Sequence, residues 1–469
     1  MTPSLVAIVL AAGEGTRFRS GTNKVLHPLL GKPMLDLVLD AVQTLKPRTT
    51  VVVTGFDGES VARLAAARGA AIALQTERRG TGHAVLAAKA SLRPSGEGDI
   101  LVVPGDLPLI RPAALKALLA RHRRRGNAAT VLSAFVPAPS GFGRIVRDPA
   151  GAIRIVEDAD AAAAERAIAE VNAAVYVFSS RELWRVLTKL SPANARREYY
   201  LTDAVGLLAA AGRKVEAWPT PQPEDIRQVN ARYDLASVLA VIRDRKLREL
   251  SDRGVTVLSP ATSWIDLDVE IGAETVIYPS VVLEGATTIG RGCRLYPGAH
   301  IMGSRLGDGV SVFSSTVIEN ATIEDGATVG PFARLRPKTV VRAGAHVGNF
   351  VEMKNTDFGR GAKAGHLSYL GDSEVQEGVN IGAGTITCNY DGVRKNRTVI
   401  EAGAFIGSGT ELVAPVRIGR GAYVAAGSVI TKDVSPDALA VARGRQIEKP
   451  GWARKKREQQ AREKSGASS

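Results

Sequence analysis

Cysteines, aromatic residues and long apolar runs are scarce in this chain of 469 residues, and each scarcity excludes a class of protein. Two cysteines, Cys293 and Cys388, cannot form a disulfide framework, and no CxxC pair indicates a zinc site. A reducing cytoplasm is therefore the expected location. No apolar stretch is long enough to span a membrane, and the first apolar run lacks the preceding basic segment of a signal peptide.

The charge is strongly positive, because 61 Lys and Arg residues face 47 Asp and Glu residues and leave a net charge of +14. A positive chain suits nucleic acid or small phosphorylated molecules. Aromatic residues make up only 5% of the chain, and the densest basic runs, His122–Arg125 and Ala453–Arg457, contain none. Binding of nucleic acid bases usually needs such stacking side chains. We therefore expect both runs to be solvated surface, and no nucleic-acid partner.

Aliphatic residues recur every six residues between Ile271 and Ile430. Six is a multiple of the strand period of two, whereas six residues of α-helix leave successive repeats on different faces. The repeat therefore predicts short strands that stack into a parallel β-helix with an aliphatic interior. Hexapeptides of this kind resemble the left-handed β-helix of acyltransferases. The register is expected to slip at 365–369 and to admit a polar insertion at 389–397, both on a binding face. The residues in register are Ile271, Ile277, Leu283, Ile289, Leu295 and Ile301, then Ile323, Val329, Leu335, Val341, Val347 and Met353, and later Ile400, Ile406, Leu412, Ile418, Val424 and Ile430.

The first half of the chain lacks this period and alternates strands with helices, which predicts an α/β Rossmann-like domain that binds ligands at the carboxyl ends of its strands. A chain of this length also exceeds one core. We expect a domain at 1–230, a linker helix at 231–250, and a β-helix domain with a charged tail at 251–469. Each domain should then work alone when the chain is cut near Asn230 or Ser251. Strands are expected at 5–10, 50–54, 100–103 and 130–135, and helices at 34–45, 59–67, 82–90 and 112–121.

A glycine-rich loop, Leu10-Ala11-Ala12-Gly13-Glu14-Gly15-Thr16-Arg17-Phe18, follows the first strand and precedes Lys24. Its main-chain N–H groups suit phosphates, and Arg17 and Lys24 add positive charge. A dinucleotide-binding loop would need a third glycine where Phe18 stands, and the chain has no GxxxxGK[ST] phosphate loop. Asp106 follows another apolar strand, so it suits a metal better than a helix cap. For Asn230 the sequence leaves a metal ligand and a turn residue as equal alternatives.

These motifs, taken together, resemble one family closely. In the first half they are LAAGEGTR at 10–17, KVLH at 24–27, QTERRGTGHA at 75–84, GDLPL at 105–109, GFGRI at 141–145, and EYYLTD at 198–203. In the second half they are GPFARLRP, NFVEMK, KAGHLSYLGD and NIGAGTITCNYDG. The chain is similar to the bacterial bifunctional N-acetylglucosamine-1-phosphate uridylyltransferases and glucosamine-1-phosphate N-acetyltransferases. The resemblance covers everything but the tail.

The resemblance implies that the first half transfers UMP from UTP to N-acetylglucosamine-1-phosphate, releasing pyrophosphate. Asp106 and Asn230 would bind Mg²⁺, and Arg17 and Lys24 would be catalytic through their charge. The family usually has Pro at position 23 and Tyr at position 104, so Asn23 is expected to loosen the loop that aims Lys24. The implied UTP and UDP-N-acetylglucosamine site comprises Leu10, Ala11, Ala12, Gly13, Lys24, Gln75, Gly80, Thr81, Pro104, Gly105, Asp106, Gly143, Glu157, Asn172 and Asn230.

The resemblance also implies that the second half acetylates glucosamine-1-phosphate with acetyl-CoA, supplying a precursor of peptidoglycan. His366 would be the general base, and Glu352 is a candidate to orient its imidazole. A homotrimer is implied as well. The implied sugar-phosphate residues are Arg336, Lys354, Tyr369 and Asn380, and the implied acetyl-CoA residues are Ala383, Asn389, Tyr390, Ser408, Ala426 and Arg443.

Several rival functions stay open for the sequence. An acetyl-Cys388 intermediate is less favoured than direct transfer, because no base stands beside that cysteine in the sequence. A zinc hydratase would need converging histidines, whereas His300, His346 and His366 are widely spaced. A monofunctional nucleotidylyltransferase with a regulatory β-helix, and a non-catalytic assembly subunit, would both leave intact motifs without a role.

Overall fold

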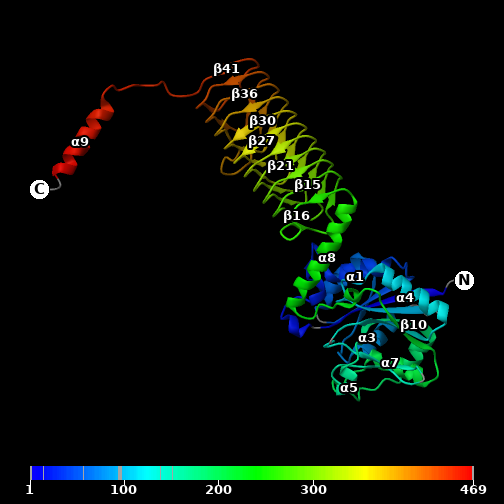
Figure 1. Cartoon of the computed structure of the whole chain (residues 1–469). Coiled ribbons are helices and arrows are strands. Elements are labelled where there is room, and N and C mark those ends of the chain that lie inside the picture. The colour runs from blue at the N-terminus through cyan, green and yellow to red at the C-terminus, as the bar shows by residue number, and fades with distance from the viewer. Residues whose placement is uncertain are drawn as a thin grey trace. The chain divides into compact units, whose positions relative to one another are not determined.

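The computed structural model describes residues 3–13, 15–55, 57–92, 98–137, 139–149 and 151–466, and the chain divides into two compact units. The first unit comprises residues 1–249 with Ile265–Leu267, and the second comprises 250–264 with 268–469. Figure 1 shows a layered α/β unit and a stack of short strands. Within the described residues, no helix has the length and apolar character needed to cross a membrane.

The first unit is built on a mixed sheet with the strand order β11-β7-β10-β6-β1-β4-β5. Strands β1, β4, β5 and β6 pair in parallel, as predicted, but β10 runs antiparallel to both β6 and β7. A hairpin of β8 and β9 extends from β10. The strands are β1 (Ser4–Ala11), β4 (Thr49–Thr54), β5 (Ala71–Leu74), β6 (Gly98–Pro104), β7 (Ala129–Phe135), β8 (Arg144–Arg147), β9 (Ile153–Val156), β10 (Glu170–Ser179) and β11 (Val215–Pro219), with the small hairpin β2 (Pro28–Leu29) and β3 (Lys32–Pro33) apart from the sheet.

Helices cover both faces of this sheet, because alternate side chains of each buried strand point to opposite faces. In β1, Leu5, Ala7 and Val9 pack with α1, α2 and α4, whereas Val6 and Ile8 pack with α3, α6 and α7. The two groups of helices are visible in Figure 1. The helices are α1 (Met34–Gln43), α2 (Gly58–Ala67), α3 (Thr81–Ala88), α4 (Pro112–Arg125), α5 (Ala163–Arg166), α6 (Ser180–Leu187) and α7 (Leu201–Ala210).

The basic run at 122–125 is the last turn of α4, and it is only partly solvated. His122 is buried, with Nδ1 2.9 Å from the hydroxyl oxygen of Thr130. The Nε of Arg123 donates to the carboxylate of Asp99 at 2.6 Å. The prediction of a solvated run was therefore wrong here, because two side chains of the run face the sheet.

Helix α8 (Arg232–Asp252) is part of the first unit's core through most of its length. Val238 and Ile242 are buried against Leu109 and Val229, in a group that also contains Phe18, Leu29, Leu30 and Met34. The Nε of Arg232 donates to the carbonyl of Phe18 at 3.0 Å. A helix with this apolar contact is more than the connector expected from the sequence.

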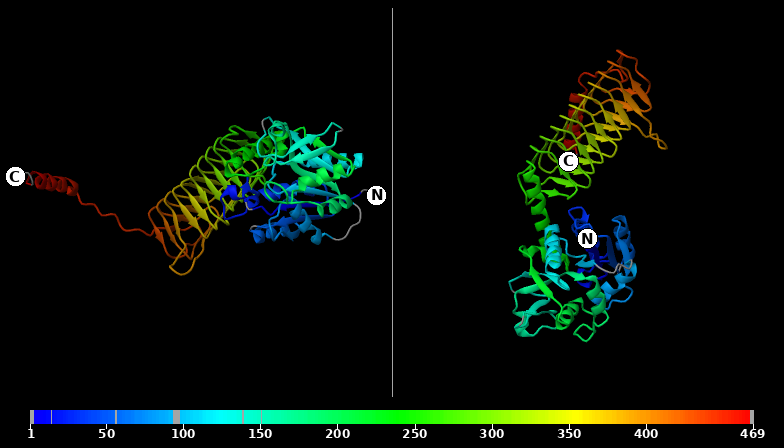
Figure 2. Two further views of the ribbon diagram at one scale, coloured as in Figure 1. Left: turned by 90° about the horizontal axis from the view of Figure 1, so that it is seen from below. Right: turned by 90° about the vertical axis from the view of Figure 1, so that its right-hand side faces the viewer.

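The second unit is a parallel β-helix whose coils each contribute one strand to three sheets, as predicted. Figure 2 shows the coils stacked along one axis. One sheet contains β12 (Thr256–Val257), β15 (Val276–Ile277), β18 (Arg294–Leu295), β21 (Ser311–Val312), β24 (Thr328–Val329), β27 (His346–Asn349), β30 (Lys363–His366), β33 (Asn380–Ile381), β36 (Phe405–Ile406), β39 (Tyr423–Val424) and β41 (Leu439–Ala440).

The other two sheets complete the triangular coil. The second includes β16 (Val282–Glu284), β19 (His300–Met302), β22 (Val317–Glu319), β25 (Arg334–Leu335), β28 (Glu352–Lys354), β31 (Tyr369–Gly371), β34 (Ile386–Cys388), β37 (Glu411–Val413) and β40 (Val429–Ile430). The third includes β14 (Glu270–Ile271), β17 (Thr288–Ile289), β20 (Arg305–Leu306), β23 (Thr322–Ile323), β26 (Val340–Val341), β29 (Asp357–Phe358), β32 (Ser373–Val375), β35 (Thr398–Ile400) and β38 (Val416–Ile418). The tail contains α9 (Trp452–Gly466), and the described side chains of this helix are exposed.

The six-residue register holds across 365–369, where a slip was expected. Ala364 and Leu370 are both buried and six positions apart, and the shortened step runs from Leu370 to Val375. Asp372 turns this tighter corner with a left-handed φ of 48°, a conformation that Asp and Asn tolerate better than most residues. The insertion expected at 389–397 lies between β34 and β35, and a loop leaves the stack of coils in the yellow-orange part of Figure 2.

Cutting the chain after Asn230 is expected to prevent the first unit from folding stably, contrary to the sequence-based expectation for that cut. The cut removes Val238 and Ile242 from the core, at a cost of roughly 1.5–3 kcal/mol each, against a total stability of about 5–15 kcal/mol. A fragment of residues 1–267 keeps these contacts and should melt cooperatively by circular dichroism. A fragment 1–230 with the same melting temperature as 1–267 would contradict this role of α8.

Candidate functional site

A cavity of about 600 Å³ opens at the carboxyl ends of β1, β5 and β6 in the first unit. Fourteen of the residues predicted from the sequence line it. They are Leu10, Ala11, Ala12, Gly13, Lys24, Gln75, Gly80, Thr81, Pro104, Asp106, Gly143, Glu157, Asn172 and Asn230. Gly105 and Arg17 stand outside this lining: Gly105 is packed against β1, where its N–H donates to the carbonyl of Leu10 at 2.8 Å.

Asn23 is fully buried and stabilises the glycine loop through hydrogen bonds. Its side-chain amide donates to the carbonyls of Ala11 at 3.4 Å and Gly13 at 3.5 Å. Its Oδ1 accepts from the N–H of Val25 at 3.1 Å and so caps the turn that contains Lys24. The expectation that Asn23 loosens the loop was therefore wrong, because the amide makes bonds that a proline ring could not make. Glu14 lies outside the described residues.

Basic side chains hold the two predicted metal ligands. The Nζ of Lys24 lies 2.5 Å from Oδ2 of Asp106, and both side chains are mostly buried. Arg17 donates through Nη2 to Oδ1 of Asn230 at 3.4 Å. The N–H of Val229 donates to the carbonyl of Asp106 at 3.1 Å, so the segments that carry the two ligands are joined by their main chains. One carboxylate and one amide oxygen fit Mg²⁺, which takes few protein oxygens and completes its shell with phosphate and water.

The next wall of the cavity is a rigid turn around Gly80, which has a left-handed φ of 99°. A Cβ here would lie 2.7 Å from the carbonyl of Tyr199, so only glycine fits. Gln75 is buried, and its amide donates to the carbonyl of Gly80 at 3.1 Å. The N–H of Leu201 donates to the hydroxyl of Thr81 at 3.0 Å. Main-chain and amide groups of this kind suit the edge of a base.

The opposite wall presents polar side chains suited to a sugar. The N–H of Asn172 donates to the carbonyl of Gly143 at 2.9 Å, and the side-chain amide of Asn172 donates to the hydroxyl of Tyr176 at 2.8 Å. Thr202 donates to Glu157 at 3.0 Å. Burial raises the pKa of the Glu157 carboxyl, and this bond to Thr202 opposes the rise. Glu157 is therefore a half-buried acceptor that lines the cavity, which suits a sugar hydroxyl.

In the second unit, His366 is exposed at the end of β30 and is oriented by Asn349. The imidazole Nδ1 lies 2.6 Å from Oδ1 of Asn349 and donates to it, which leaves Nε2 able to accept a proton. Glu352 forms an ion pair with Arg336 at 3.0 Å. The suggestion that Glu352 orients the imidazole is therefore replaced: Asn349, its neighbour in the paired strand, does so.

Three basic side chains of the same unit, Arg336, Lys354 and Lys395, lie close together and form a cation cluster around Lys354. The proximity of Lys395 is the largest cause that lowers the pKa of Lys354, and Arg336 lowers it further. Glu352 and Asp372 compensate this positive charge only in part, and clustered cations of this kind suit a bound phosphate. Tyr369 lies beside this cluster: a Cβ on Gly371 would meet its hydroxyl at 2.5 Å.

Four of the six residues expected to bind acetyl-CoA, Ala383, Ser408, Ala426 and Arg443, form a column along the β-helix axis. The N–H of Gly409 donates to Ala383, the N–H of Gly427 donates to Ser408, and Arg443 donates through Nη1 to Ala426 at 2.8 Å. His366 precedes this column, since the N–H of Gly384 donates to the carbonyl of Leu367. Parallel coils repeat at about 4.8 Å, so the column spans roughly 19 Å from His366 to Arg443. Such a row of small residues suits an extended ligand.

The remaining predicted residues of the second unit are placed as follows. Asn389 is buried, and its side-chain amide donates a hydrogen bond to the carboxylate of Asp372 at 2.5 Å. This bond gives Asn389 a structural role in addition to the expected binding role. Tyr390 is exposed and donates to the carbonyl of Gly392 at 2.5 Å. Asn380 lies on β33, where it pairs with Lys363 of β30. Asn380 therefore occupies the coil next to that of His366.

Neither rival chemistry of the β-helix gains support from its geometry. Burial, followed by the carboxylate of Glu411, raises the pKa of Cys388, whereas a nucleophilic cysteine needs a lowered pKa. The described residues contain no group of three or more His, Cys, Asp or Glu side chains that could hold a metal ion. His300 contacts Glu284, His346 contacts Thr328 and His366 contacts Asn349, so the three imidazoles have no shared partner among these bonds.

Comparison with known proteins identifies the family of both domains. Residues 7–250 match the MobA-like NTP transferase domain, and residues 397–432 match the bacterial transferase hexapeptide (six repeats). The bifunctional protein GlmU of Brevibacillus brevis is 44% identical over 96% of this chain and 97% of its own length. The proteins of the same name from Carboxydothermus hydrogenoformans and Thermotoga petrophila are each 45% identical, over 95% and 97% of this chain and 99% and 100% of their own lengths. The chain belongs to the bifunctional GlmU family.

Membership of the GlmU family confirms the pairing of a nucleotidyltransferase domain with a hexapeptide acetyltransferase domain, and it does not support a monofunctional enzyme. The structure adds residues that sequence reasoning missed. Arg78, Arg196, Glu198, Thr202 and Gln228 also line the first cavity. The EYYLTD motif at 198–203 was the signal for two of them, since it recurs in the family pattern. Lys395 and Asn349 could not be identified from a local motif, because their partners lie in other coils of the β-helix.

Replacing Lys395 with Ala is expected to weaken binding of a sugar 1-phosphate to the second unit, because one of three clustered cations is lost. As the pH rises, binding to the unmodified protein should begin to weaken below the pH at which an ordinary lysine loses its proton. The reason is the lowered pKa of Lys354, which makes this side chain lose its charge at a lower pH. Calorimetric titration at several pH values measures both effects. Arg394→Ala, in the same exposed loop, is the matched control. Equal affinities in the two variants would contradict the phosphate role of Lys395.

Proposed function

We propose that the first unit joins UTP to N-acetylglucosamine-1-phosphate, and that the second unit makes that sugar phosphate by acetylating glucosamine-1-phosphate. The observation that carries the first activity is the Lys24–Asp106 pair, which lies beside Asn230 in a cavity with a glycine loop. The observation that carries the second is His366, which Asn349 orients at the end of the column, in the unit that also contains the cation cluster.

In uridylyl transfer, a phosphate oxygen of the sugar phosphate attacks the α-phosphorus of UTP and pyrophosphate leaves. The chain supplies position and charge, with no covalent intermediate. Gln75 and the turn at Gly80 hold the base, Glu157 and Asn172 hold the sugar, and Lys24 neutralises charge on the phosphates. Asp106 and Asn230 would hold Mg²⁺, which would neutralise the triphosphate. Lys24 then has to exchange at least part of its contact with Asp106 for phosphate oxygens.

In acetyl transfer, the neutral amine of glucosamine-1-phosphate attacks the thioester carbonyl of acetyl-CoA, and CoA leaves as its thiolate. Nε2 of His366 accepts the proton that the amine loses, since Nδ1 is bonded to Asn349. The cation cluster binds the sugar phosphate, and the column from Ala383 to Arg443 binds the CoA chain. Cys388 takes no part in bond making.

We also propose a homotrimer in which neighbouring copies cover an apolar corner of the β-helix. Phe332, Phe350 and Leu367 occupy this corner in successive coils, with φ values of 55°, 56° and 47°. A left-handed conformation costs such residues about 1–3 kcal/mol, and yet all three stay more than half exposed. The rings of Phe332 and Phe350 stack at 5.4 Å. Leu367 adjoins His366, so a covering copy would also enclose the acetyl-transfer site.

Two single substitutions should separate the two activities. Asp106→Ala removes a metal ligand and is expected to abolish uridylyl transfer while sparing acetyl transfer. His366→Ala is expected to slow acetyl transfer by roughly 10²–10⁴ while sparing uridylyl transfer. Coupled assays of each reaction on purified protein measure both, with Cys388→Ala as the control that keeps most of its acetyl transfer. The assignment fails if each substitution lowers both rates equally, or if an acetyl group is trapped on Cys388.

The trimer prediction is tested by making the apolar corner polar. Phe332→Ser together with Phe350→Ser is expected to shift the mass in light scattering from three chains to one, because the double substitution removes the stacked rings from the proposed contact. Acetyl transfer should fall with the mass, and uridylyl transfer should persist. Val393→Ser, at an exposed apolar position in the inserted loop, is the control. A double variant that keeps the mass of three chains would show that the corner is not the interface.

A further inference from the structure

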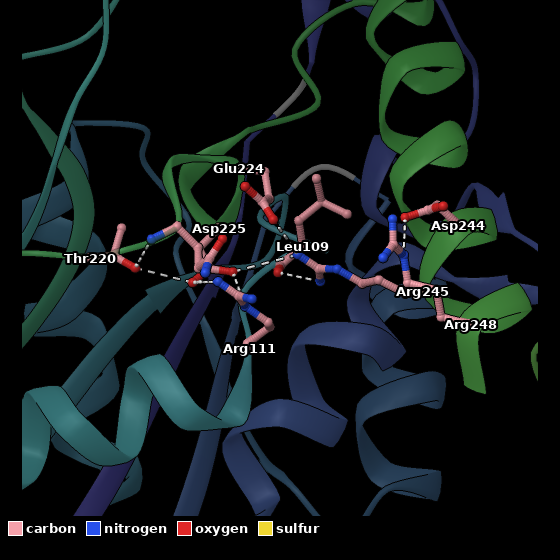
Figure 3. A network of polar contacts seen from close by, with 9 residues as sticks. Leu109, Arg111, Thr220, Glu224, Asp225, Asp244, Arg245 and Arg248 are labelled. Carbon is pink, nitrogen blue, oxygen red and sulfur yellow. Dashed lines mark hydrogen bonds and ion pairs between the residues drawn. The ribbon is translucent and has the colours of Figure 1, made fainter. Parts of the chain in front are cut away.

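A polar network centred on the buried Asp225 includes Arg111, Thr220 and Arg245 (Figure 3). The Asp225 side chain is 1% exposed and accepts from Arg111 in a bidentate manner, with distances of 2.7 Å to Nε and 3.0 Å to Nη2. The hydroxyl of Thr220 donates to the same carboxylate at 3.2 Å. A buried carboxylate with this many donors holds its segment in one geometry.

Arg245 brings helix α8 into the network from the other side. Its Nη1 donates to the carbonyl of Leu109 at 2.8 Å. Its Nη2 lies 3.6 Å from Asp225 and 3.9 Å from Glu224, is buried, and has no hydrogen-bond partner among the residues that the structure describes. One guanidinium thus faces two loops at once, one through a carbonyl and one through carboxylates.

The two loops that Arg245 contacts are those that carry the predicted metal ligands. Leu109 lies in the loop that begins after β6 and includes Asp106, and Asp225 lies in the segment that leads to Asn230. The N–H of Val229 joins these loops at the carbonyl of Asp106. The first turn of α8 also holds Asn230, whose N–H donates to Asp234 at 2.7 Å. Helix α8 therefore fixes both ligand segments.

We propose that Arg245 is a positioning residue for the metal-nucleotide site: it fixes the loops of Asp106 and Asn230 at the separation that one divalent cation needs. The inference rests on the proposed uridylyl transfer. Arg245 itself does not line the cavity that contains the nucleotide site. Its loss therefore acts on metal affinity and on the rate of transfer, and leaves the walls that hold the base and the sugar intact.

The chain offers a matched control on the same helix. Arg248 pairs with Asp244 at 2.8 Å, and its side chain is 77% exposed (Figure 3). Arg245→Ala and Arg248→Ala remove the same side chain one turn apart. Arg245→Lys keeps the charge and the bond to Leu109, but an ammonium group cannot reach the carbonyl and Asp225 together as the planar guanidinium does.

The experiment compares these variants in the full chain. For Arg245→Ala, the Mg²⁺ concentration for half-maximal uridylyl transfer should rise roughly 10–100-fold, as expected when a residue that supports metal ligands is lost. The KM for N-acetylglucosamine-1-phosphate should stay within about twofold of the unmodified value, because the sugar wall is unchanged. In calorimetry without Mg²⁺, UTP should bind Arg245→Ala and the unmodified protein with the same affinity. With Mg²⁺ present, UTP should bind Arg245→Ala more weakly than it binds the unmodified protein. Arg248→Ala should match the unmodified protein throughout.

Each outcome decides the matter. An unchanged Mg²⁺ dependence and unchanged Mg²⁺-dependent UTP binding in Arg245→Ala would overturn the inference, even if that variant melts at a lower temperature. If Arg245→Ala fails to fold, Arg245→Lys replaces it, and a stable Arg245→Lys with the Mg²⁺ response of the unmodified protein would also overturn the inference. Absence of uridylyl transfer in the unmodified protein would instead refute the proposed function itself.

Discussion

Parallel strand pairing is the constraint on which both units depend. Parallel strands are related by translation, so equivalent ends or positions of successive strands come to lie side by side. In the first unit this brings the segments after β1, β5 and β6 to one edge, where a glycine loop, Gln75 and Asp106 meet. In the second unit it stacks the same position of each coil into a column. Residues distant in sequence thereby become neighbours through the pairing of their strands, without needing a side-chain contact to bring them together.

Close stacking of the coils also sets where large side chains can stand. A Cβ on Gly348 would lie 1.9 Å from the carbonyl of Gly365, and one on Gly382 would lie 2.5 Å from the N–H nitrogen of Ser408. These positions can carry only hydrogen, because the adjacent coil occupies the space. Bulky residues therefore stand only where the adjacent coil leaves room, which includes the interior, outward strand positions such as Phe405 and Tyr423, and the outer corners. Stacking of the coils therefore permits Phe332 and Phe350 at an outer corner but does not require large apolar residues there.

Sequence reasoning located whatever depends on local chemistry. A six-residue period indicates strands whichever way the coils wind, and short motifs identified most of the first cavity, because glycine loops and strand-end carboxylates occur within a few residues of each other. It failed where the deciding partner lies elsewhere in the chain. Asn349 contacts His366 from the previous coil, and Asn23 contacts two carbonyls of a separate loop. The role of α8 was missed because the partners of Arg245 precede it by many residues.

The inserted loop at 389–397 lies apart from the strand pairing that stabilises the β-helix. Strand β35, which follows the loop, pairs with β32 and β38, and β34, which precedes it, pairs with β31 and β37. The hydrogen-bonded ladder therefore continues on both sides of the loop, and the loop's buried Asn389 is bonded to Asp372 of the coils, whereas residues 390–395 are exposed. Lys395 can vary, or the loop can change in length, with little effect on the core. In evolutionary terms, ligand preference can drift here while the scaffold remains under separate selection for stability.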